Sequence, residues 1–437
     1  MTDPKQPSRP VGVVAELDVA SAIPGIAASE STTEALVLVR LFTEPIGLLY
    51  QRLGDGGLQP DELARVIVGE LGPQLRERIL GCGLSWTGEL PTNGLRPPRM
   101  PSFLESRARV LREGPRMTVA VCTRDRPESL ARLLDSLAAQ QYERMRVLVV
   151  DNAPSDDRTR RCVSDAAARL DLHYVVEERP GLSWARNRAL AQSDGEVIAW
   201  ADDDEICDPW WAAELARGFV EVPDAAAVTG LIVPKELETE SQALFERYSG
   251  VHRGRGFERI VYRAGPARTQ SPLYPLPPFG TGGNMALRRD ALNRIGGFDC
   301  ALGAGTAAMA GEDTAALSLV MLGGGTLVYQ PTAITRHSHR RDYEMLRRLL
   351  LGYGRGLGAY YLSVLLRHPG TAAEMLKLSR RALTDELSHR SGRFEELGDD
   401  FPRELLRANR IGLLQGPFMY VRSRLAIRKL PPPTPAR

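Results

Sequence analysis

The chain has 437 residues, 43% of them hydrophobic and 25% charged, with 56 Lys and Arg against 54 Asp and Glu. It is long enough to bury a large core and to hold more than one domain. A net charge of +2 excludes a strongly basic molecule that would trap nucleic acid. The charge is uneven, because the segment from Arg336 to the end carries 20 Lys and Arg and only 10 Asp and Glu.

The cysteines and the N-terminus indicate a protein of the reducing cytoplasm. The five cysteines are odd in number and form no CxxC pair, so neither a zinc site nor a disulfide framework is expected. The first residues, "MTDPKQPSRPVGVVAELDV", have no long apolar core, which argues against a signal peptide. No uninterrupted apolar run approaches ~20 residues, so no membrane span is expected.

The N-terminal part of the chain predicts a small α+β region. We expect residues 1–12 to be a disordered tail and residues 13–100 to contain strands, a helix and a linker. "VGVVAELDV" and "EALVLVRLFTEPIGLLYQRL" have the pattern of strands, with "EPIG" as the expected turn. A helix is expected to begin near Pro60, and the Pro-rich stretch 91–102 is typical of a linker.

Residues 115–340 predict an α/β catalytic domain. The apolar segments "RMTVAVCT", "RVLVVDN", "HYVVEE" and "EVIAWADDD" have the composition of buried strands, and each is separated from the next by a helical pattern. This alternation predicts a mainly parallel sheet with helices on both faces. Ligands of such sheets bind beyond the carboxyl ends of the strands.

Polar residues follow three of these strands, where the chain reaches the carboxyl edge of the sheet. They are Thr123-Arg124-Asp125, Asp151-Asn152 and Asp202-Asp203-Asp204, and we expect them to converge. In an extended chain Asp202 and Asp204 would point to one side and Asp203 to the other. Paired carboxylates suit Mg²⁺ or Mn²⁺, and a diphosphate would complete the shell. Taken alone, the three aspartates could equally form a solvated turn that caps the next helix.

Beyond residue 234 the pattern is irregular, and residues 235–278 are expected to form a long excursion. "GTGGNMALRRDALNRIGGFD" predicts a glycine-rich turn, a strand and a helix. Glu312 and Asp313 follow Gly311 at the start of a predicted helix, whose dipole favours an ionised acid. Residues 303–311 are expected to form a mobile loop beside them.

The C-terminal part predicts a basic, helical extension over residues 341–430 and a disordered tail over residues 431–437. Glycines 352, 354, 356 and 358 would weaken an isolated helix, so packing on the catalytic domain is expected to hold it. A basic face on these helices could also lie against an anionic membrane surface.

Several motifs in order resemble a family 2 inverting glycosyltransferase of the GT-A fold. The resemblance runs from about residue 117 to 345, through "VAVCTRDRPESLARLLDSLAAQQ", "VLVVDNAPSD", "ERPGLSWARNRAL", "GEVIAWADDDE", "GTGGNMALRR", "IGGFD", "GEDTAALSLVMLGGG" and "VYQPTAITRHSHRR". The flanking regions resemble the extensions of actinobacterial members. The resemblance implies the nucleotide-diphospho-sugar transferase fold, with the N-terminal region and the helical extension added to it.

The resemblance also implies roles for individual residues. Asp313 is implied as the base that activates the acceptor. The metal ligands implied are Asp204, Asp202 and His337, with His339 as an equally placed alternative. The residues implied to bind the nucleotide sugar are Thr123, Arg124, Asp151, Arg186, Asp202 and Asp203, and those of the acceptor loop are Gly282, Gly283, Asn284 and Glu312.

The implied reaction moves a sugar from a nucleotide diphosphate, with UDP expected, to a hydroxyl of a glycan, a lipid-linked molecule or a secondary metabolite. It is implied to be a single displacement with inversion, assisted by Mn²⁺ or Mg²⁺, in cell-envelope or polysaccharide biosynthesis. The expected location is the cytoplasm, with peripheral membrane contact through the basic helices.

Two other classes of protein remain as alternatives. A nucleotidyltransferase would need a glycine-rich, basic loop after the first strand, and "CTRDRPES" contains no glycine. A non-catalytic module that binds a nucleotide or glycan would be expected to lack Asp204 or Asp313, and both are present.

Overall fold

The structure is a computed structural model, and it describes residues 12–29, 32, 34–249, 255–264, 271–273, 279–387, 397 and 401–430. Residues 1–11 of the predicted tail 1–12 lie outside the described residues, as do the predicted tail 431–437 and parts of the 235–278 excursion. The chain divides into two compact units. The first contains residues 1–113, 232–258 and 336–342, and the second contains residues 114–231, 259–335 and 343–437.

The first unit contains a three-stranded sheet with the order β1-β2-β3. Strand β1 pairs parallel with β2, which pairs antiparallel with β3. Apolar side chains of α1, among them Leu63, Ile67 and Leu75, join those of the sheet in one hydrophobic cluster. The elements of this unit are β1 (Val13–Asp18), β2 (Glu34–Leu41), β3 (Glu44–Arg52), α1 (Pro60–Gly81), α2 (Ser102–Glu113) and α7 (Glu240–Ser249).

The turn between β2 and β3 lies at Phe42 and Thr43, so the prediction of a turn at "EPIG" was wrong. Both residues have a positive φ, 51° and 71°, which neither side chain favours. The Asp18 carboxylate compensates by accepting hydrogen bonds from the backbone nitrogens of Phe42, at 3.0 Å, and Thr43, at 2.6 Å. A side chain 24 residues away therefore stabilises a turn that the local sequence does not indicate.

Two segments from later in the chain join this first unit. Gly12 forms a bridge with Leu237, and the Arg336 guanidinium lies 2.6 Å from the Glu16 carboxylate. The unit is therefore discontinuous in sequence, unlike the expected N-terminal region over residues 13–100.

The large sheet has nine strands among the described residues, with the order β10-β12-β9-β11-β7-β4-β5-β6 and β8 paired to β12. β7, β4, β5 and β6 are mutually parallel, which confirms the predicted parallel arrangement for this half. In the other half, β11 runs antiparallel to both β7 and β9. The bounds are β4 (Met117–Thr123), β5 (Met145–Asn152), β6 (Leu172–Glu177), β7 (Val197–Ala201), β8 (Glu205–Cys207), β9 (Ala225–Pro234), β10 (Ile260–Tyr262), β11 (Asn284–Arg288) and β12 (Thr326–His337).

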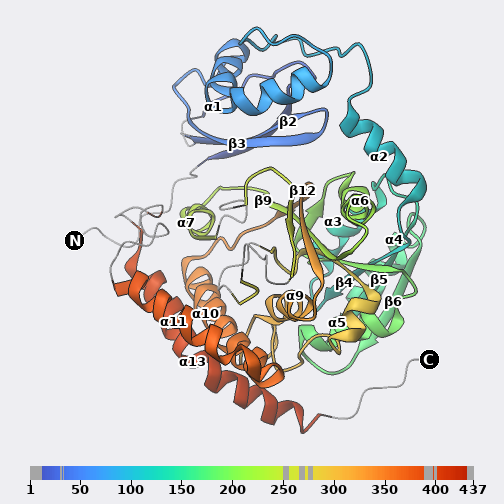
Figure 1. The fold of residues 1–437 in the computed structure, drawn as a ribbon, viewed down its shortest axis with the longest axis vertical. Coiled ribbons are helices and arrows are strands. Elements are labelled where there is room, and N and C mark those ends of the chain that lie inside the picture. Colours follow the sequence, from blue (N-terminus) through green and yellow to red (C-terminus); the bar gives the residue numbers. More distant parts are fainter. Residues whose placement is uncertain are drawn as a thin grey trace. The chain divides into compact units, whose positions relative to one another are not determined.

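Helices of the second unit bury their apolar faces against this sheet (Figure 1). Leu130, Leu133, Leu134 and Leu137 of α3 are fully buried, as their helical spacing predicts. The five cysteines are all free in the structure. The helices are α3 (Pro127–Ala138), α4 (Arg158–Ala166), α5 (Leu182–Gln192), α6 (Trp211–Glu221), α8 (Arg289–Arg294) and α9 (Glu312–Leu322).

The C-terminal part is helical, as predicted, and consists of α10 (Tyr343–Arg367), a 3-10 turn (Pro369–Thr371), α11 (Ala372–Leu387) and α13 (Arg403–Ile427). In Figure 1, α10 and α13 lie side by side. By length and composition α10 could cross a membrane, which the sequence analysis did not expect, and 50% of its apolar window is buried inside the protein.

Glycines allow α10 and α13 to approach closely. A Cβ atom on Gly354 would lie 2.0 Å from the backbone oxygen of Asn409, and one on Gly358 would lie 2.3 Å from that of Leu413. Both distances are far below van der Waals contact, so only glycine fits at these positions in the observed packing. The glycines that weaken an isolated helix therefore create the contact that holds this one.

We predict that Gly354→Ala destabilises the second unit by more than about 2 kcal/mol, because the new methyl group meets rigid backbone. Gly352→Ala in the same helix is the matched control. Its Cβ would meet the flexible end of Met309 at 3.2 Å, so a much smaller effect is expected. Thermal unfolding of the full chain measures both. Equal melting temperatures for the two variants would contradict this account.

Candidate active site

The strand ends at the carboxyl edge of the sheet meet, as the sequence predicts. Thr123 at the end of β4 is the register partner of Asp151 at the end of β5. The Thr123 hydroxyl donates a hydrogen bond of 2.7 Å to the Asp203 carboxylate, which follows β7. Three neighbouring parallel strands thus bring a hydroxyl and several carboxylates to one rim.

The three aspartates follow the end of the strand and form a turn. β7 ends at Ala201. The backbone nitrogen of Glu205 donates a hydrogen bond of 3.1 Å to the backbone oxygen of Asp202, which closes a turn. The Arg126 guanidinium lies 3.0 Å from the Asp203 carboxylate and 3.2 Å from that of Asp204. Arg126 thus contacts both Asp203 and Asp204, and the pairing of Asp202 with Asp204 on one side stays a prediction.

Arg126 was not among the residues selected from the sequence. Its position three residues after Thr123, at the same strand end, is the signal that could have identified it. Its positive charge partly neutralises Asp203 and Asp204. The charged partner of Asp202 is Arg186.

Asp202 lies in a crowded acidic environment. Loss of hydration raises the pKa of Asp202 to about 6, the Arg186 guanidinium opposes this shift, and the carboxylates of Asp204 and Asp203 add to it. Its side chain is 44% exposed, so a ligand can reach it. A divalent cation would relieve this repulsion, and hard carboxylate oxygens are suitable ligands. Among the described residues, however, no three His, Cys, Asp or Glu side chains form a group that could hold a metal ion.

Asp151 is fully buried beside β6. Its Oδ2 atom accepts a hydrogen bond of 2.7 Å from the Tyr174 hydroxyl, and its Oδ1 atom has no hydrogen-bond partner within the described part of the chain. Burial raises the pKa of Asp151. Because a buried polar atom is normally satisfied, Oδ1 is available to a ligand donor.

Arg124, which the sequence places beside Asp151, has a half-exposed side chain. Its Nε atom lies 3.7 Å from the Asp125 carboxylate. Asp125 has a positive φ of 55° and accepts two hydrogen bonds of 2.9 Å from the backbone and hydroxyl of Ser155. These bonds fix the loop that carries Arg124.

The buried guanidinium of Arg186 connects the rim to the residues of α9. It donates a hydrogen bond of 2.8 Å to the Glu312 carboxylate and one of 3.3 Å to the Gly282 oxygen. It also lies 3.5 Å from Asp202. A buried guanidinium is stable only when it is paired and hydrogen-bonded in this way. Arg186 therefore fixes three separate segments relative to one another.

The glycine-rich turn presses directly on these side chains. A Cβ atom on Gly282 would lie 2.5 Å from an Arg186 nitrogen, and one on Gly283 would lie 2.3 Å from the Glu205 carboxylate. Burial raises the pKa of Glu205 well above its usual range. The turn thus contacts the protein's own charged groups, and its predicted contact with donor or acceptor stays a prediction.

Asn284 has a structural position at the start of β11. Its amide nitrogen donates to the backbone oxygens of Leu231 and Ala333, both at 2.9 Å. Its amide oxygen accepts a bond of 2.9 Å from the Trp211 indole. These three bonds join β11, β9, β12 and α6. The Asn284 amide, which the sequence suggested for the acceptor loop, is therefore hydrogen-bonded within the protein.

Glu312 and Asp313 open α9, as predicted, after Gly311, whose φ is 94°. Asp313 accepts a bond of 2.6 Å from the Gly282 nitrogen and one of 2.7 Å from the Thr314 nitrogen. Burial raises the pKa of Glu312 to about 7; the neighbouring Asp313 adds to this shift and Arg186 opposes it. The half-buried Asp313 is thus held by two backbone hydrogen bonds, and Glu312 is paired with Arg186.

The loop before α9, expected to be mobile, is held by several hydrogen bonds. The Ala307 nitrogen donates to the Ser423 hydroxyl at 3.1 Å, and the Leu182 nitrogen donates to the Ala304 oxygen at 2.9 Å. Its contacts therefore join it to both α13 and α5.

His337 and His339 belong to the first unit. Their Nδ1 atoms lie 2.9 Å apart, and the Nε2 atom of His339 lies 3.0 Å from the Glu246 carboxylate. The Phe245 ring packs edge-on against His339. Metal binding by either histidine stays a prediction.

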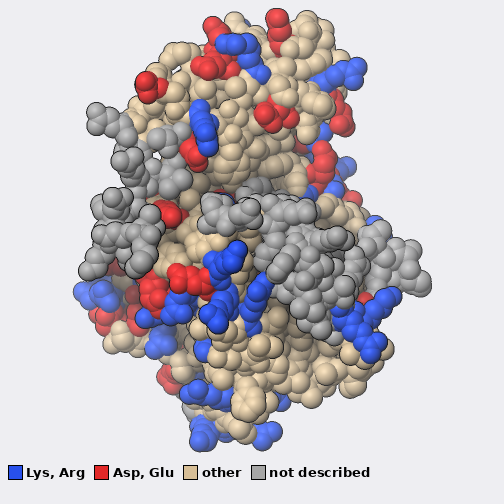
Figure 2. All heavy atoms as spheres, turned by 90° about the vertical axis from the view of Figure 1, so that its left-hand side faces the viewer, with Lys and Arg blue, Asp and Glu red and all other residues tan. Residues whose placement is uncertain are grey.

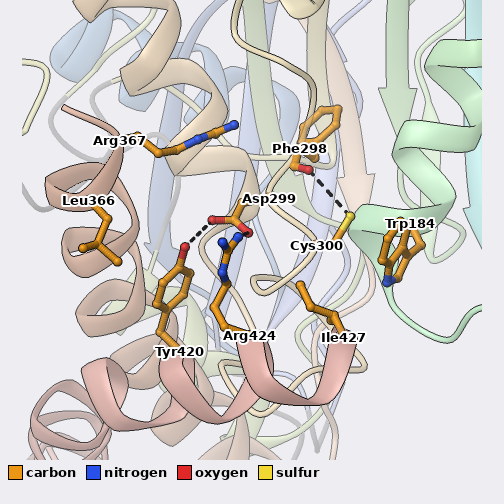
Figure 3. A pocket seen from close by; sticks show the side chains of 9 residues that line it. All are labelled: Trp184, Phe298, Asp299, Cys300, Leu366, Arg367, Tyr420, Arg424 and Ile427. Atoms are coloured by element: carbon orange, nitrogen blue, oxygen red, sulfur yellow. Dashed lines mark hydrogen bonds and ion pairs between the residues drawn. The ribbon is translucent and has the colours of Figure 1, made fainter. Parts of the chain in front are cut away.

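A cavity of about 390 Å³ lies between the loop after α8 and the C-terminal helices (Figure 3). Asp299 lies in its wall and accepts bonds from the hydroxyls of Ser363, at 2.6 Å, and Tyr420, at 2.7 Å. The cavity is lined by none of the residues predicted for the donor or the base; its lining is Trp184, Phe298, Asp299, Cys300, Leu366, Arg367, Tyr420, Arg424 and Ile427.

Comparison with known proteins agrees with this arrangement. Residues 118–296 match the profile of the family described as Glycosyl transferase family 2. A glucosyl-dolichyl phosphate glucuronosyltransferase of Haloferax volcanii is 26% identical over 55% of this chain and 76% of its own length. The succinoglycan biosynthesis protein ExoM of Rhizobium meliloti is 31% identical over 49% of this chain and 64% of its own length.

A solved mannosyltransferase from Pyrobaculum calidifontis, in complex with GDP-Man and Mn²⁺, is similar over 75% of this chain and 81% of its own, with 18% identity and a TM-score of 0.44.

Parallel strands that end in acids, together with the match to a glycosyl transferase profile, indicate a sugar transferase. The domain that contains residues 118–296 is similar to glycosyltransferase family 2, and the chain is a glycosyltransferase.

We predict that Arg186→Met lowers the free energy of unfolding by about 3–5 kcal/mol, because it leaves the buried Glu312 carboxylate without its partner. The double variant Arg186→Met/Glu312→Gln should be less destabilised than the sum of the single variants. Arg132→Met, at an exposed position on α3, is the control. Chemical denaturation measures all four. Strict additivity would show that Arg186 and Glu312 do not interact.

Proposed function

We propose that this glycosyltransferase moves a sugar from a nucleotide diphosphate to an acceptor hydroxyl in one displacement, with inversion at the anomeric carbon. A UDP-sugar is the expected donor. The acceptor class is a glycan, a lipid-linked molecule or a secondary metabolite.

In this proposal the nucleotide binds at the ends of β4 and β5. The unpartnered Oδ1 atom of Asp151 supports a role in binding the base, because it can accept a donor N–H in a site shielded from water. Thr123 and Arg124 lie at the neighbouring strand end, and Asp203 is held by Thr123 and Arg126. In this proposal the contact between Asp151 and the nucleobase sets the preference for a UDP-sugar.

The diphosphate is proposed to bind between the aspartates and Arg186. Asp202 and Asp204 fit as the protein's share of a shell for Mn²⁺ or Mg²⁺, which donor oxygens and water would complete. A bound divalent ion would stabilise the negative charge that develops on the leaving diphosphate. Arg186 supports the same charge through its position beside Asp202.

Asp313 is proposed to accept the proton of the acceptor hydroxyl. Its carboxylate is held in the first turn of α9 by the backbone nitrogens of Gly282 and Thr314. The single observation that carries the proposal is the backbone of Gly282, whose nitrogen donates to Asp313 and whose oxygen accepts from Arg186. This peptide segment connects the proposed base to the proposed diphosphate site. One base and one stabilised leaving group are the requirements for a single displacement.

We expect Asp313→Asn to reduce sugar transfer by about a hundredfold or more, because the amide cannot accept the proton. Nucleotide binding should survive, since the Asn oxygen can still accept the bond from Gly282. Asp165→Asn, at an exposed position on α4, is the control and should retain full activity. A product assay and a nucleotide titration separate the two effects. Unchanged transfer by Asp313→Asn would remove this residue from the mechanism.

A panel of UDP-, GDP- and dTDP-sugars, each with and without Mn²⁺, tests the donor site. Binding to the folded state raises the melting temperature in proportion to ligand excess. We expect a metal-dependent shift with one nucleotide family and its loss in Asp204→Asn. A shift of the same size in the presence of EDTA would argue against metal-assisted binding.

The same proposal places the enzyme in the cytoplasm, with the basic C-terminal helices as its contact with the inner face of the membrane. The relatives support a role in cell-envelope or polysaccharide biosynthesis, because their names describe work on a dolichyl phosphate and on succinoglycan.

A further inference from the structure

One face of α13 exposes a continuous apolar stripe. Leu414 and Phe418 at its centre are 83% and 81% exposed, values that a packed helix does not normally give to residues of this kind. The spacing of three and four residues places all members of the stripe on one side of the helix. The stripe consists of Ile411, Leu414, Phe418, Val421 and Leu425.

The opposite face of α13 is already used. Leu405, Ala408, Gly412, Gly416, Tyr420 and Ser423 are buried, and a Cβ atom on Gly412 would lie 2.2 Å from a backbone oxygen of α10. The stripe is therefore not the core face of a displaced helix. It is a second apolar face on a helix whose packing is complete.

Basic residues frame the stripe at both ends. The helix Arg403–Ile427 carries five arginines and one acidic residue, Glu404. Arg410 precedes the stripe, and Arg422 and Arg424 interrupt its last turn. Figure 2 faces the side on which α10, α11 and α13 lie in Figure 1, and Lys and Arg side chains gather on its lower part. Long arginine side chains can place their charge at lipid headgroups while an apolar stripe enters the layer below.

The uncharged segment Ile411–Val421 has 11 residues, about half of the ~20 that a helix needs to span a bilayer. It also contains Pro417. A helix of this kind lies in the plane of the interface rather than across it. The apolar surface continues onto the end of α10, where the exposed Leu366 lines the cavity of Figure 3 together with Ile427.

A second copy of the chain is a poor occupant of this face. The stripe has the spacing of a coiled-coil seam, in which the flanking positions of the two helices meet. Here those positions hold Arg410, Arg422 and Arg424 and no acid. Pairing two copies would bring like charges together, which opposes association. Anionic lipid headgroups supply the complementary charge.

We propose that the α13 stripe, with its flanking arginines, is a docking surface for an anionic membrane. This surface holds the enzyme in the plane of the interface without a membrane span. This inference assigns the membrane contact of the proposed function to named residues of α13. It does not depend on which donor, catalytic base or metal the enzyme uses.

Vesicle flotation of the full chain tests the inference, with vesicles of phosphatidylcholine alone and vesicles containing about a third phosphatidylglycerol. We expect binding to the anionic vesicles and little to the neutral ones. Leu414→Gln/Phe418→Gln should bind at least about tenfold more weakly, because two apolar anchors are lost. Arg410→Gln/Arg422→Gln should lose the preference for anionic lipid.

The matched control is Leu80→Gln, an exposed apolar position on α1 of the first unit, which should bind as the unaltered chain does. Retained melting temperatures show that the stripe variants fold, and sugar transfer to a water-soluble acceptor, which does not require the membrane, is measured separately. Equal binding to both vesicle types, no binding to either, or unchanged binding by the stripe variants would overturn the inference. So would a dimer in light scattering that Leu414→Gln/Phe418→Gln converts to monomer, since a second copy would then occupy the face.

Discussion

The buried guanidinium of Arg186 is the charge on which the arrangement of this site depends. Removing an arginine from water is costly, and the cost is offset only where acids and carbonyl oxygens surround the group. Here they come from α9, from the glycine-rich turn and from the rim after β7. Because these three segments are far apart in sequence, one side chain links the folding of the sheet to the position of the acids at its edge.

The glycines beside this arginine follow from the same constraint. A guanidinium and a buried carboxylate occupy the space that side chains at 282 and 283 would need. Backbone groups at this turn therefore contact charged side chains directly. The backbone oxygen of Gly282 accepts a hydrogen bond from Arg186, and its nitrogen donates one to Asp313. The absence of side chains is thus a condition of the charge network, independent of any ligand.

The sequence predicted the features that depend on local periodicity. The parallel arrangement of β7, β4, β5 and β6, the convergence of the polar ends of β4, β5 and β7, and the helix that opens at Glu312 all follow from apolar runs and capping patterns. The features that it failed to predict depend on long-range contacts. Asp18 stabilises the turn at Phe42 and Thr43 from another strand. Arg126 contacts Asp203 and Asp204 from the loop that follows β4, and the first unit includes residues 232–258 and 336–342.

The contact between Gly311 and α10 has a consequence for the modularity of this protein. A Cβ atom on Gly311 would lie 2.6 Å from the backbone oxygen of Gly356, and one on Gly356 would lie 2.5 Å from the Ala310 side chain. The residue that caps the helix of Glu312 and Asp313 thus rests on α10. A catalytic domain excised at about residue 340 would lose the surface that shapes its own proposed base. These helices are an integral part of the catalytic fold, and domain shuffling must transfer them with it.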